Sequence, residues 1–283
     1  IGQPGADFGV DRNPRMPAPL AVSGRLFHQG MNRMVAVDSY NGAVLWSLEI
    51  PDLHRMNLPR DAGNWCTDQS SLYVAIKDHC WVIDHLTGAL KRVFRLPAGA
   101  TNDKLDWGYV AHSNGVLFGS TVKRGTAYTD FWGGASWYDK TSGAGTGKVC
   151  SDMLFAYDLE TGSLLWQYEK GVAINTTLAA GSGRLYFVES RNPAIKQQAQ
   201  RRISAAGLWA EQFLVALDER SGNVQWEVPI DTADGTVVFF LGCTDETIVL
   251  TSSAQGKYHL YAFNARTGGQ VWENEHKWPS DNH

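Results

Sequence analysis

The sequence predicts an all-β protein built from repeated four-stranded sheets. A short pattern, in which Asp or Asn at the end of a strand-like run is followed four residues later by Gly, recurs at five places along the chain, and four of these copies have Trp four residues after the Gly. The segments between the copies contain short runs rich in β-branched and aromatic residues, bounded by Gly, Asn, Asp and Ser. Glycine (29) and tryptophan (11) are abundant, which suits many turns with aromatic packing between sheets.

The five copies of the pattern give the spacing of the repeat. They begin at Asp38, Asp84, Asp158, Asp218 and Asn264, with spacings of 46, 74, 60 and 46 residues. The Asp at a strand end accepts hydrogen bonds from backbone N–H groups of the turn, and the Gly supplies a positive φ. We expect the Trp that follows to pack between neighbouring sheets. Arg92 replaces this Trp in the second copy, so we expect a weaker contact there.

Each unit divides into four strand-like runs. They cover 64–67, 72–76, 80–84 and 90–96 in the second unit, and 237–243, 247–252, 259–264 and 270–274 in the fifth. A four-stranded sheet every ~45 residues, stacked radially so that the edges are protected, describes a β-propeller. Because the repeat runs nearly from end to end, we expect residues 1–283 to form a single domain.

Charge and composition exclude several classes of protein. The net charge is −4, and the 25 basic residues are scattered among 29 acidic ones, so the sequence has no nucleic-acid-binding footprint. No stretch approaches the ~18 apolar residues of a membrane span. The four cysteines, at 66, 80, 150 and 243, have no metal-ligand spacing, and we expect them to be free buried thiols.

The third and fourth units are longer than the basic repeat, and in both the extra residues lie between the second and third strands. The extra segments are 124–152 and 190–212, which a propeller places on one face, together with the links from one sheet to the next. In the second insertion we expect a helix capped by Asn192, begun by Pro193 and ended by Gly207, which is either a lid or bracing helix packed on the propeller or a partner-binding helix. The first insertion carries Trp132 and Trp137, which suit either a stacking surface for a planar ligand or sugar, or a self-packed loop.

Three of the repeats resemble the repeat of the pyrroloquinoline quinone (PQQ) enzymes. The runs are Val35–Trp46, Phe155–Trp166 and Leu214–Trp226. The resemblance covers nearly the whole chain and implies a β-propeller that commonly has seven or eight blades, so we expect the five repeats to be part of a larger ring. The segment Asn57–Trp65 is also similar to large PQQ-like proteins of planctomycete-type bacteria.

The resemblance implies more about architecture than about activity. Some members of the family are alcohol or sugar dehydrogenases that hold PQQ and calcium on the propeller axis. Others, such as the lipoprotein scaffold of the outer-membrane β-barrel assembly machinery, share the blades without a cofactor. The adjacent cysteine pair of the alcohol dehydrogenases is missing here. The family also implies a periplasmic or secreted location in a bacterium.

A cluster of charged, amide and aromatic residues forms the candidate ligand site. Its members are Arg55, Asn57, Arg60, Asp61, Asn64, Trp65, Asp106, Trp107 and Asn175. Arg pairs with carboxylates and Trp stacks on flat rings, so the cluster suits an anionic planar ligand. The alternative is that Arg60 and Asp61 form a structural ion pair within their loop. The sequence assigns no catalytic residue and no metal ligand.

These observations favour a binding or scaffold module of a larger extracytoplasmic bacterial protein. Its ligand site is expected on the insertion-bearing face, and its partner is expected to be a protein, a small molecule or a carbohydrate. Two alternatives remain open. One is a dehydrogenase domain that oxidises an alcohol or sugar with PQQ and calcium, and the other is a carbohydrate-binding propeller that uses the aromatic insertion.

Overall fold

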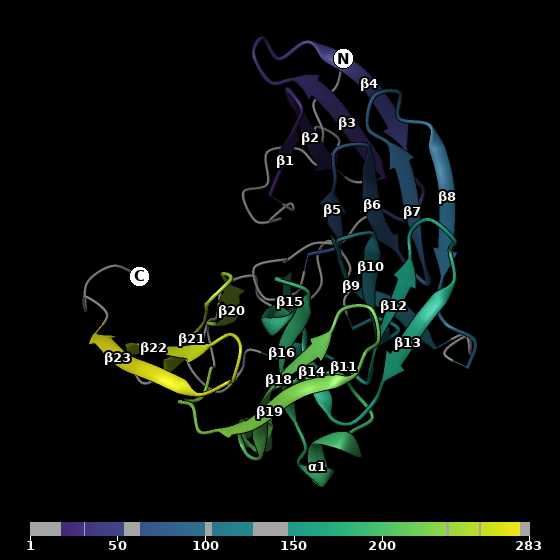
Figure 1. The fold of residues 1–283 in the computed structure, drawn as a ribbon. Coiled ribbons are helices and arrows are strands. Elements are labelled where there is room, and N and C mark those ends of the chain that lie inside the picture. The colour runs from purple at the N-terminus through teal and green to yellow at the C-terminus, as the bar shows by residue number, and fades with distance from the viewer. Residues whose placement is uncertain are drawn as a thin grey trace.

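Five antiparallel sheets follow one another along an arc (Figure 1). The computed structural model describes residues 18–30, 32–53, 63–99, 104–126, 147–235, 238–254 and 256–277. Nearly all regular elements in these ranges are β-strands, and the first strand of each sheet lies on the inner side of the arc (Figure 1). The predicted all-β, propeller-type fold is confirmed, while the number of blades in a complete ring stays a prediction.

The first, second and fifth sheets are simple four-stranded meanders. The first contains β1 (Leu20–Val22), β2 (Arg25–Gly30), β3 (Arg33–Asp38) and β4 (Val44–Glu49). The second contains β5 (Trp65–Thr67), β6 (Ser71–Ile76), β7 (His79–Asp84) and β8 (Leu90–Arg95). The fifth contains β20 (Phe239–Cys243), β21 (Thr247–Ala254), β22 (Lys257–Asn264) and β23 (Gln270–Lys277). The predicted runs in the second and fifth units agree with these strands to within a few residues.

The third and fourth sheets have the same core with additions. The third contains β9 (Leu105–Ser113), β10 (Val116–Lys123), β12 (Met153–Asp158) and β13 (Leu164–Tyr168). The fourth contains β14 (Val172–Ile174), the 3-10 turn η3 (Asn175–Thr177), β15 (Ala179–Gly181), β16 (Arg184–Ser190), β18 (Gln212–Asp218) and β19 (Val224–Ile230). Two short insertion strands, β11 (Lys148–Ser151) and β17 (Arg202–Ile203), extend the fourth sheet to seven strands.

The repeated turn has the geometry that its sequence predicts. In the first copy the Oδ1 atom of Asp38 accepts hydrogen bonds from the backbone N–H groups of Tyr40 and Asn41, at 2.9 and 3.1 Å. The N–H of Gly42 donates to the Asp38 carbonyl oxygen at 2.9 Å, and Gly42 has φ = 75°. A left-handed φ favours glycine because a Cβ would crowd the following carbonyl oxygen.

At three joints the Trp that follows the turn packs against the next sheet. A Cβ added to the glycine of the following turn would lie 2.4 to 2.9 Å from the indole, so the ring rests directly on that glycine. The pairs are Trp46 with Gly88, Trp166 with Gly222, and Trp226 with Gly268. Each indole N–H also donates to the carbonyl oxygen of the residue after the turn Asp or Asn, at 3.0, 2.9 and 3.2 Å. The predicted inter-sheet role of Trp is confirmed.

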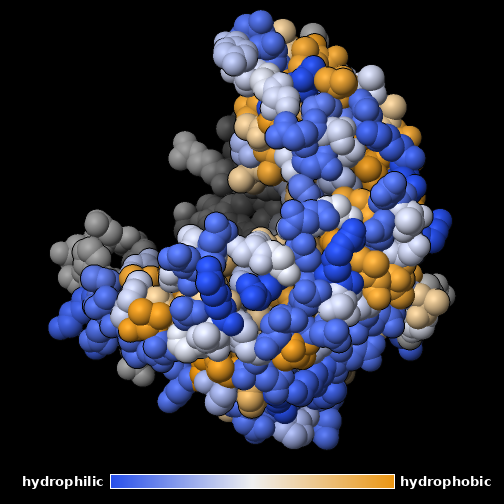
Figure 2. All heavy atoms as spheres, in the orientation of Figure 1, coloured by the Kyte–Doolittle hydropathy of each residue, from blue (hydrophilic) through white to orange (hydrophobic). Residues whose placement is uncertain are grey.

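Four large hydrophobic clusters form the core, and each draws residues from two neighbouring sheets. Phe118 of the third sheet packs with Phe187 of the fourth, for example, and Tyr186 of the fourth packs with Phe263 of the fifth. The molecular surface in the same orientation is largely hydrophilic, with hydrophobic residues in patches over the first sheet and along the outer strands (Figure 2). The core therefore lies between sheets, and the sheets hold each other in place.

The helix predicted in the second insertion is much shorter than expected. α1 covers only Pro193–Lys196, with the Asn192 side chain capping it by accepting from the N–H of Ala194 at 2.9 Å. The cap and the first helical residue are thus confirmed, but the continuation to Gly207 is wrong. The guanidinium of Arg201 donates hydrogen bonds to the backbone carbonyl oxygens of Lys196, Gln198 and Gln200. The chain then continues into β17 and forms no further turns of this helix.

Candidate functional site on the insertion-bearing face

The two insertions join into one structure. β11, from the insertion of the third unit, pairs on one side with β14 and on the other side with β17, from the insertion of the fourth unit. Ile195, Ile203 and Leu208 are buried in the core cluster between the fourth and fifth sheets, so the second insertion is anchored by apolar contacts. We call the described part of this structure, residues 147–152 and 191–211, the insertion platform.

A buried arginine locks the two halves of the platform together. Arg201 is 2% exposed, and its Nε and Nη2 atoms donate to the Asp152 carboxylate at 2.6 to 2.9 Å. The Arg201 carbonyl oxygen also accepts from the N–H of Cys150 at 2.8 Å. A fork of charge-assisted hydrogen bonds fixes both distance and orientation. The platform is therefore held rigidly relative to the third and fourth sheets.

An ion network beneath the platform ties the third sheet to the fourth. The fully buried Glu189 carboxylate accepts from Tyr168 Oη at 2.9 Å and from Arg191 Nε at 2.7 Å. Arg191 donates through its other two nitrogens to Glu227, which also accepts from Lys170 at 2.7 Å. Burial raises the pKa of Glu189 despite these donors. Hydrogen bonds from Arg191 and Lys170 lower the pKa of Glu227 to about 2.

The sequence did not single out this network. Its members come from the end of β13, from β16, from β19 and from the start of the second insertion, so their partnership depends on the sheet register. The one available signal was Arg191, directly before the predicted helix cap. Its guanidinium lies 3.8 Å above the centre of the Phe213 ring, a cation–π contact that adds to the packing of the network.

Among the predicted ligand residues, Asn64 and Trp65 lie at the joint between the first and second sheets. Asn64 is fully buried and donates from Nδ2 to Gln29 Oε1 at 3.1 Å, while its own Oδ1 receives no hydrogen bond from the described residues. Trp65 is 6% exposed and belongs to the core cluster there. Its ring faces the hydrophobic core.

Asp106 and Trp107 lie on β9, and both are buried. Asp106 is 2% exposed, with its Oδ1 atom 3.6 Å from Arg124 Nε. Burial raises the pKa of its carboxyl even though Arg124 opposes the shift. The indole of Trp107 is completely buried, meets Phe155 edge to face at 4.8 Å between ring centres, and donates to the carbonyl oxygen of Tyr109 at 2.6 Å.

Asn175 lies in η3 and takes part in a buried hydrogen-bond chain. Its Oδ1 accepts from Ser151 Oγ at 2.5 Å, and Ser151 Oγ is 2.9 Å from Ser120 Oγ. Ser120 in turn accepts from the backbone N–H of Tyr109 at 2.9 Å. This chain ties β11 of the platform to the third and fourth sheets. All three residues of η3 are buried.

The remaining predicted ligand residues lie outside the described part of the chain. They are Arg55, Asn57, Arg60, Asp61, Trp132 and Trp137. Their grouping into a ligand site, and the stacking role of the two tryptophans, therefore stay predictions. In the described part of the chain, Asn64, Asp106 and Asn175 have separate local partners, which are Gln29, Arg124 and Ser151.

As the structure places them, Trp107, Asp106 and Asn175 do not offer a site for the quinone and calcium that the resemblance to the PQQ enzymes implies. A platform for a planar quinone needs an exposed ring face, but Trp107 is covered by Phe155 and lies stacked on Tyr157. The Asp106 carboxyl lies beside Arg124, and the Asn175 amide oxygen is already bonded to Ser151. Within the ranges that the structure describes, no three His, Cys, Asp or Glu side chains gather as a metal-binding group.

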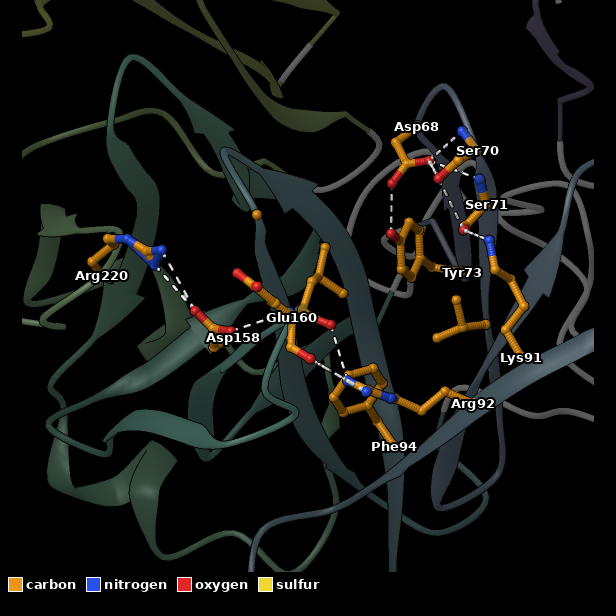
Figure 3. Close-up of a pocket in the computed structure, with 13 residues that line it drawn as sticks. Asp68, Ser70, Ser71, Tyr73, Lys91, Arg92, Phe94, Asp158, Glu160 and Arg220 are labelled. Carbon is orange, nitrogen blue, oxygen red and sulfur yellow. Dashed lines mark hydrogen bonds and ion pairs between the residues drawn. The ribbon is translucent and has the colours of Figure 1, made fainter.

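A hollow of about 500 Å³ lies on the opposite face, between the second and third sheets (Figure 3). It opens beside Arg92, the residue that replaces the repeat's Trp. The guanidinium donates to the carbonyl oxygens of Leu159 and Glu160 at 2.9 and 3.3 Å, as the indole does at the other joints. A second hollow, of about 660 Å³, lies between the fourth and fifth sheets, where the repeat keeps Trp226. The replacement of Trp by Arg92 therefore does not by itself account for a hollow.

The lining of the hollow is polar, and its polar side chains largely form hydrogen bonds with one another. Although burial opposes ionisation, hydrogen bonds from Tyr73, Ser70 and Ser71 lower the pKa of Asp68. Arg220 reaches across from the fourth sheet to the Oδ2 atom of Asp158 at 3.3 Å (Figure 3). The hollow therefore offers an incoming ligand few unpaired polar groups.

Comparisons with known proteins agree with this architecture. The family described as outer membrane protein assembly factor BamB matches residues 32–237 and 210–280. No curated protein matches the chain in sequence. Among the described residues, no helix is long and apolar enough to cross a membrane.

Several solved structures have a similar fold. BamB from Moraxella catarrhalis aligns with a TM-score of 0.51 and 14% identity, covering 92% of this chain and 63% of that one. The quinohemoprotein alcohol dehydrogenase ADHIIG from Pseudomonas putida HK5 aligns with a TM-score of 0.57 and 16% identity, covering 94% and 42%. The chain therefore spans less than two thirds of the length of either protein.

At such low identity the structural likeness shows the fold alone. The Pan2 WD40 domain of Neurospora crassa, for example, aligns with a TM-score of 0.53 at 10% identity. The family match is more specific, because it rests on the sequence and extends over most of the repeats. The chain belongs to the BamB family of PQQ-type repeat proteins.

Proposed function

We propose that this protein is a binding and scaffold module whose partner docks on the insertion-bearing face. The observation that carries the proposal is the joining of two insertions, from neighbouring repeats, into one ladder with the fourth sheet. Extra segments on a rigid scaffold are where binding functions usually reside. Here the described parts of these segments, residues 147–152 and 191–211, are held together by the ion pair between Arg201 and Asp152.

A scaffold role also agrees with the chemistry of the described residues. The buried carboxylates Glu189 and Asp106 each lie beside an arginine of the protein itself. We therefore expect the module to present a preformed surface to a protein partner, in a periplasmic or extracellular setting. The similarity to BamB, which is named for its part in outer membrane protein assembly, supports the same kind of role.

Site-specific photocrosslinking in the producing cells tests the proposal. Gln197 is exposed on the platform, and Thr161 is exposed in a repeat turn on the opposite face, so the two form a matched pair. A photoreactive residue at position 197 is expected to crosslink a discrete partner protein, and one at position 161 is not. Equal adducts from both positions, or none from position 197, would contradict a partner-binding platform.

Cell fractionation tests the proposed location separately. The protein is expected in the periplasmic or extracellular fraction, with a cytoplasmic enzyme as the marker for leakage. If the protein is recovered with the cytoplasmic marker, the extracytoplasmic location is rejected. The crosslinking experiment then tests the docking face independently of the location.

A further inference from the structure

The joint between the third and fourth sheets places two cations on a carboxylate and an aromatic ring of the fourth sheet. Arg191 donates to both oxygens of the Glu227 carboxylate, at 3.1 and 2.7 Å, and its guanidinium lies 3.8 Å above the centre of the Phe213 ring. Lys170 of the third sheet's last segment donates to the same carboxylate at 2.7 Å. At this joint the protein therefore supplies its own guanidinium group.

The joint between the fourth and fifth sheets keeps the carboxylate and a ring but not the cations. Counted from the turn Asp or Asn and along the strand ladders, the residues that correspond to Glu227, Phe213, Lys170 and Arg191 are, in turn, Glu273, His259, Ile230 and Ala254. Among the described residues no basic side chain pairs with Glu273, which accepts only from Gln270 Nε2, at 3.3 Å. The second and third sheets have Val93 and Gln167 at this position, so the carboxylate is not a general feature of the repeat.

The hollow of about 660 Å³ between the fourth and fifth sheets lies over these groups. Two carboxylates and two stacked rings line it, from Glu273, Asp231, His259 and Tyr261. The ring centres lie 6.4 Å apart, with 13° between the ring planes. Burial raises the pKa of Tyr261, and the negative charges of Glu273 and Asp231 add to the shift, so both carboxylates lie near this ring. None of the residues that line the hollow is Lys or Arg.

We propose that this hollow binds a guanidinium group, such as that of an arginine side chain. A guanidinium group donates two parallel hydrogen bonds to a carboxylate and stacks its flat face on an aromatic ring. Arg191 shows both contacts at the neighbouring joint. An ammonium group fits less well, because it has neither the fork of donors nor the flat face. The proposal does not depend on the proposed function.

One end of the hollow lies beside the insertion platform. Thr232, which lines the hollow, donates to Gln212 Oε1 at 2.8 Å. Gln212 in turn donates to the carbonyl oxygen of Leu208, a residue of the platform, at 3.5 Å. A protein docked on the platform is therefore well placed to insert an arginine, and free arginine is the other source of the same group.

Nuclear magnetic resonance titrations of the protein at neutral pH test the proposal. The probe is N-acetyl-arginine methylamide, and the readout is the backbone amide signals of Gly268 and Gly269, which line the hollow. We expect shifts that saturate with this probe and no shifts with the uncharged N-acetyl-citrulline methylamide. Glu273→Gln should weaken binding about fivefold or more. Glu275→Gln is the matched control, because that carboxylate already pairs with Lys257 at 2.8 Å, and it should change binding by less than about twofold.

A second pair of variants gives the joint a cation of its own. Ile230→Lys places an ammonium group where Lys170 stands at the neighbouring joint. It should pair with Glu273 and weaken binding of the probe about fivefold. Ile230→Met, which adds length without charge, should leave binding unchanged, and urea unfolding checks that both variants are folded.

Three outcomes would overturn the proposal. They are no saturable binding of the arginine probe, equal binding of the citrulline probe, and equal binding of the arginine probe by the unaltered protein and Glu273→Gln. A titration with free arginine identifies the source of the group. Tighter binding of the blocked probe indicates an arginine within a protein chain, and tighter binding of free arginine indicates the amino acid itself, so either order supports a guanidinium site.

Discussion

The joint between the third and fourth sheets and the joint between the second and third differ at one position of the repeat. Trp166 and Arg92 both donate to the carbonyl oxygen after the turn Asp, at the same distance of 2.9 Å. At one joint the Trp166 indole lies above Gly222, whereas at the other the Arg92 guanidinium lies above Gly162 and the hollow of Figure 3 opens beside it. The two joints therefore keep the same hydrogen bond with side chains of different shape, so mutations can separate hydrogen bonding from packing.

Removing the indole should have the largest effect. Trp166→Ala loses both the hydrogen bond and the filling of a buried space, so we expect the free energy of unfolding in urea to fall by about 3–5 kcal/mol. Trp272→Ala is the matched control, because the same side chain there is 42% exposed. It should cost less than about 1 kcal/mol. Equal losses at the two positions would mean that the joint does not depend on Trp packing.

Changing the glycine beneath the ring separates packing from backbone strain. Both Gly222 and Gly42 have a left-handed φ, at 70° and 75°, so Ala at either position costs about 1–2 kcal/mol. At Gly222 the new Cβ would also lie 2.4 Å from the Trp166 ring, whereas at Gly42 it meets nothing. We expect Gly222→Ala to cost about 2–4 kcal/mol in total because overpacking is added. Urea unfolding of both variants gives the difference, and similar losses would contradict a tight ring-on-glycine contact.

The third-to-fourth joint has a second clamp on the insertion side, which the pH dependence can isolate. The pKa of Glu227 is lowered, so its stabilisation is present above the unfolded pKa of about 4.3 and is lost as the pH falls through about 2. We expect Glu227→Gln to lower the free energy of unfolding by about 1–2 kcal/mol at pH 7. The difference from the unaltered protein should shrink steadily below about pH 4.3.

Urea unfolding between pH 7 and pH 3 measures this difference. Glu169→Gln is the control, because Glu169 is an exposed carboxylate close to the same joint and should change the free energy of unfolding by less than about 0.5 kcal/mol at any pH. A difference for Glu227→Gln that stays constant with pH would show that the loss is not electrostatic.

The turns and joints were predictable from the sequence because they are local or periodic. Asp38 and Gly42 form a hydrogen bond within one turn. The spacing of the repeat then brings Trp46 onto Gly88, the glycine of the turn in the next sheet. The ends of the insertions and the cap at Asn192 followed from the same local chemistry. The early end of α1 was not predictable from the sequence. Arg201 donates hydrogen bonds to the carbonyl oxygens of Lys196 and Gln198, which a longer helix would use itself, and these contacts depend on the tertiary structure.

The candidate site was harder to predict than the fold. Trp107 and Asn175 were chosen as polar or aromatic residues near the axis, yet both are used inside the structure, one in the core and one in a hydrogen-bond chain. The sequence shows which side chains are able to bind a ligand but not which ones the protein uses internally. Glu189 and Arg191 illustrate the reverse case, since only the strand register reveals that they meet.

Restoring the missing indole should have the smallest effect and the opposite sign. Arg92→Trp is expected to fill the hollow between the second and third sheets and to place its N–H on the Leu159 carbonyl oxygen. Filling a partly open space of this kind typically adds about 0.5–2 kcal/mol to the free energy of unfolding. Arg92→Lys is the control, because it keeps the charge but neither fills the hollow nor presents the guanidinium fork, and it should be mildly destabilising. If Arg92→Trp has a lower free energy of unfolding than Arg92→Lys, the contact between the second and third sheets depends on the arginine, and an indole does not fit in its place.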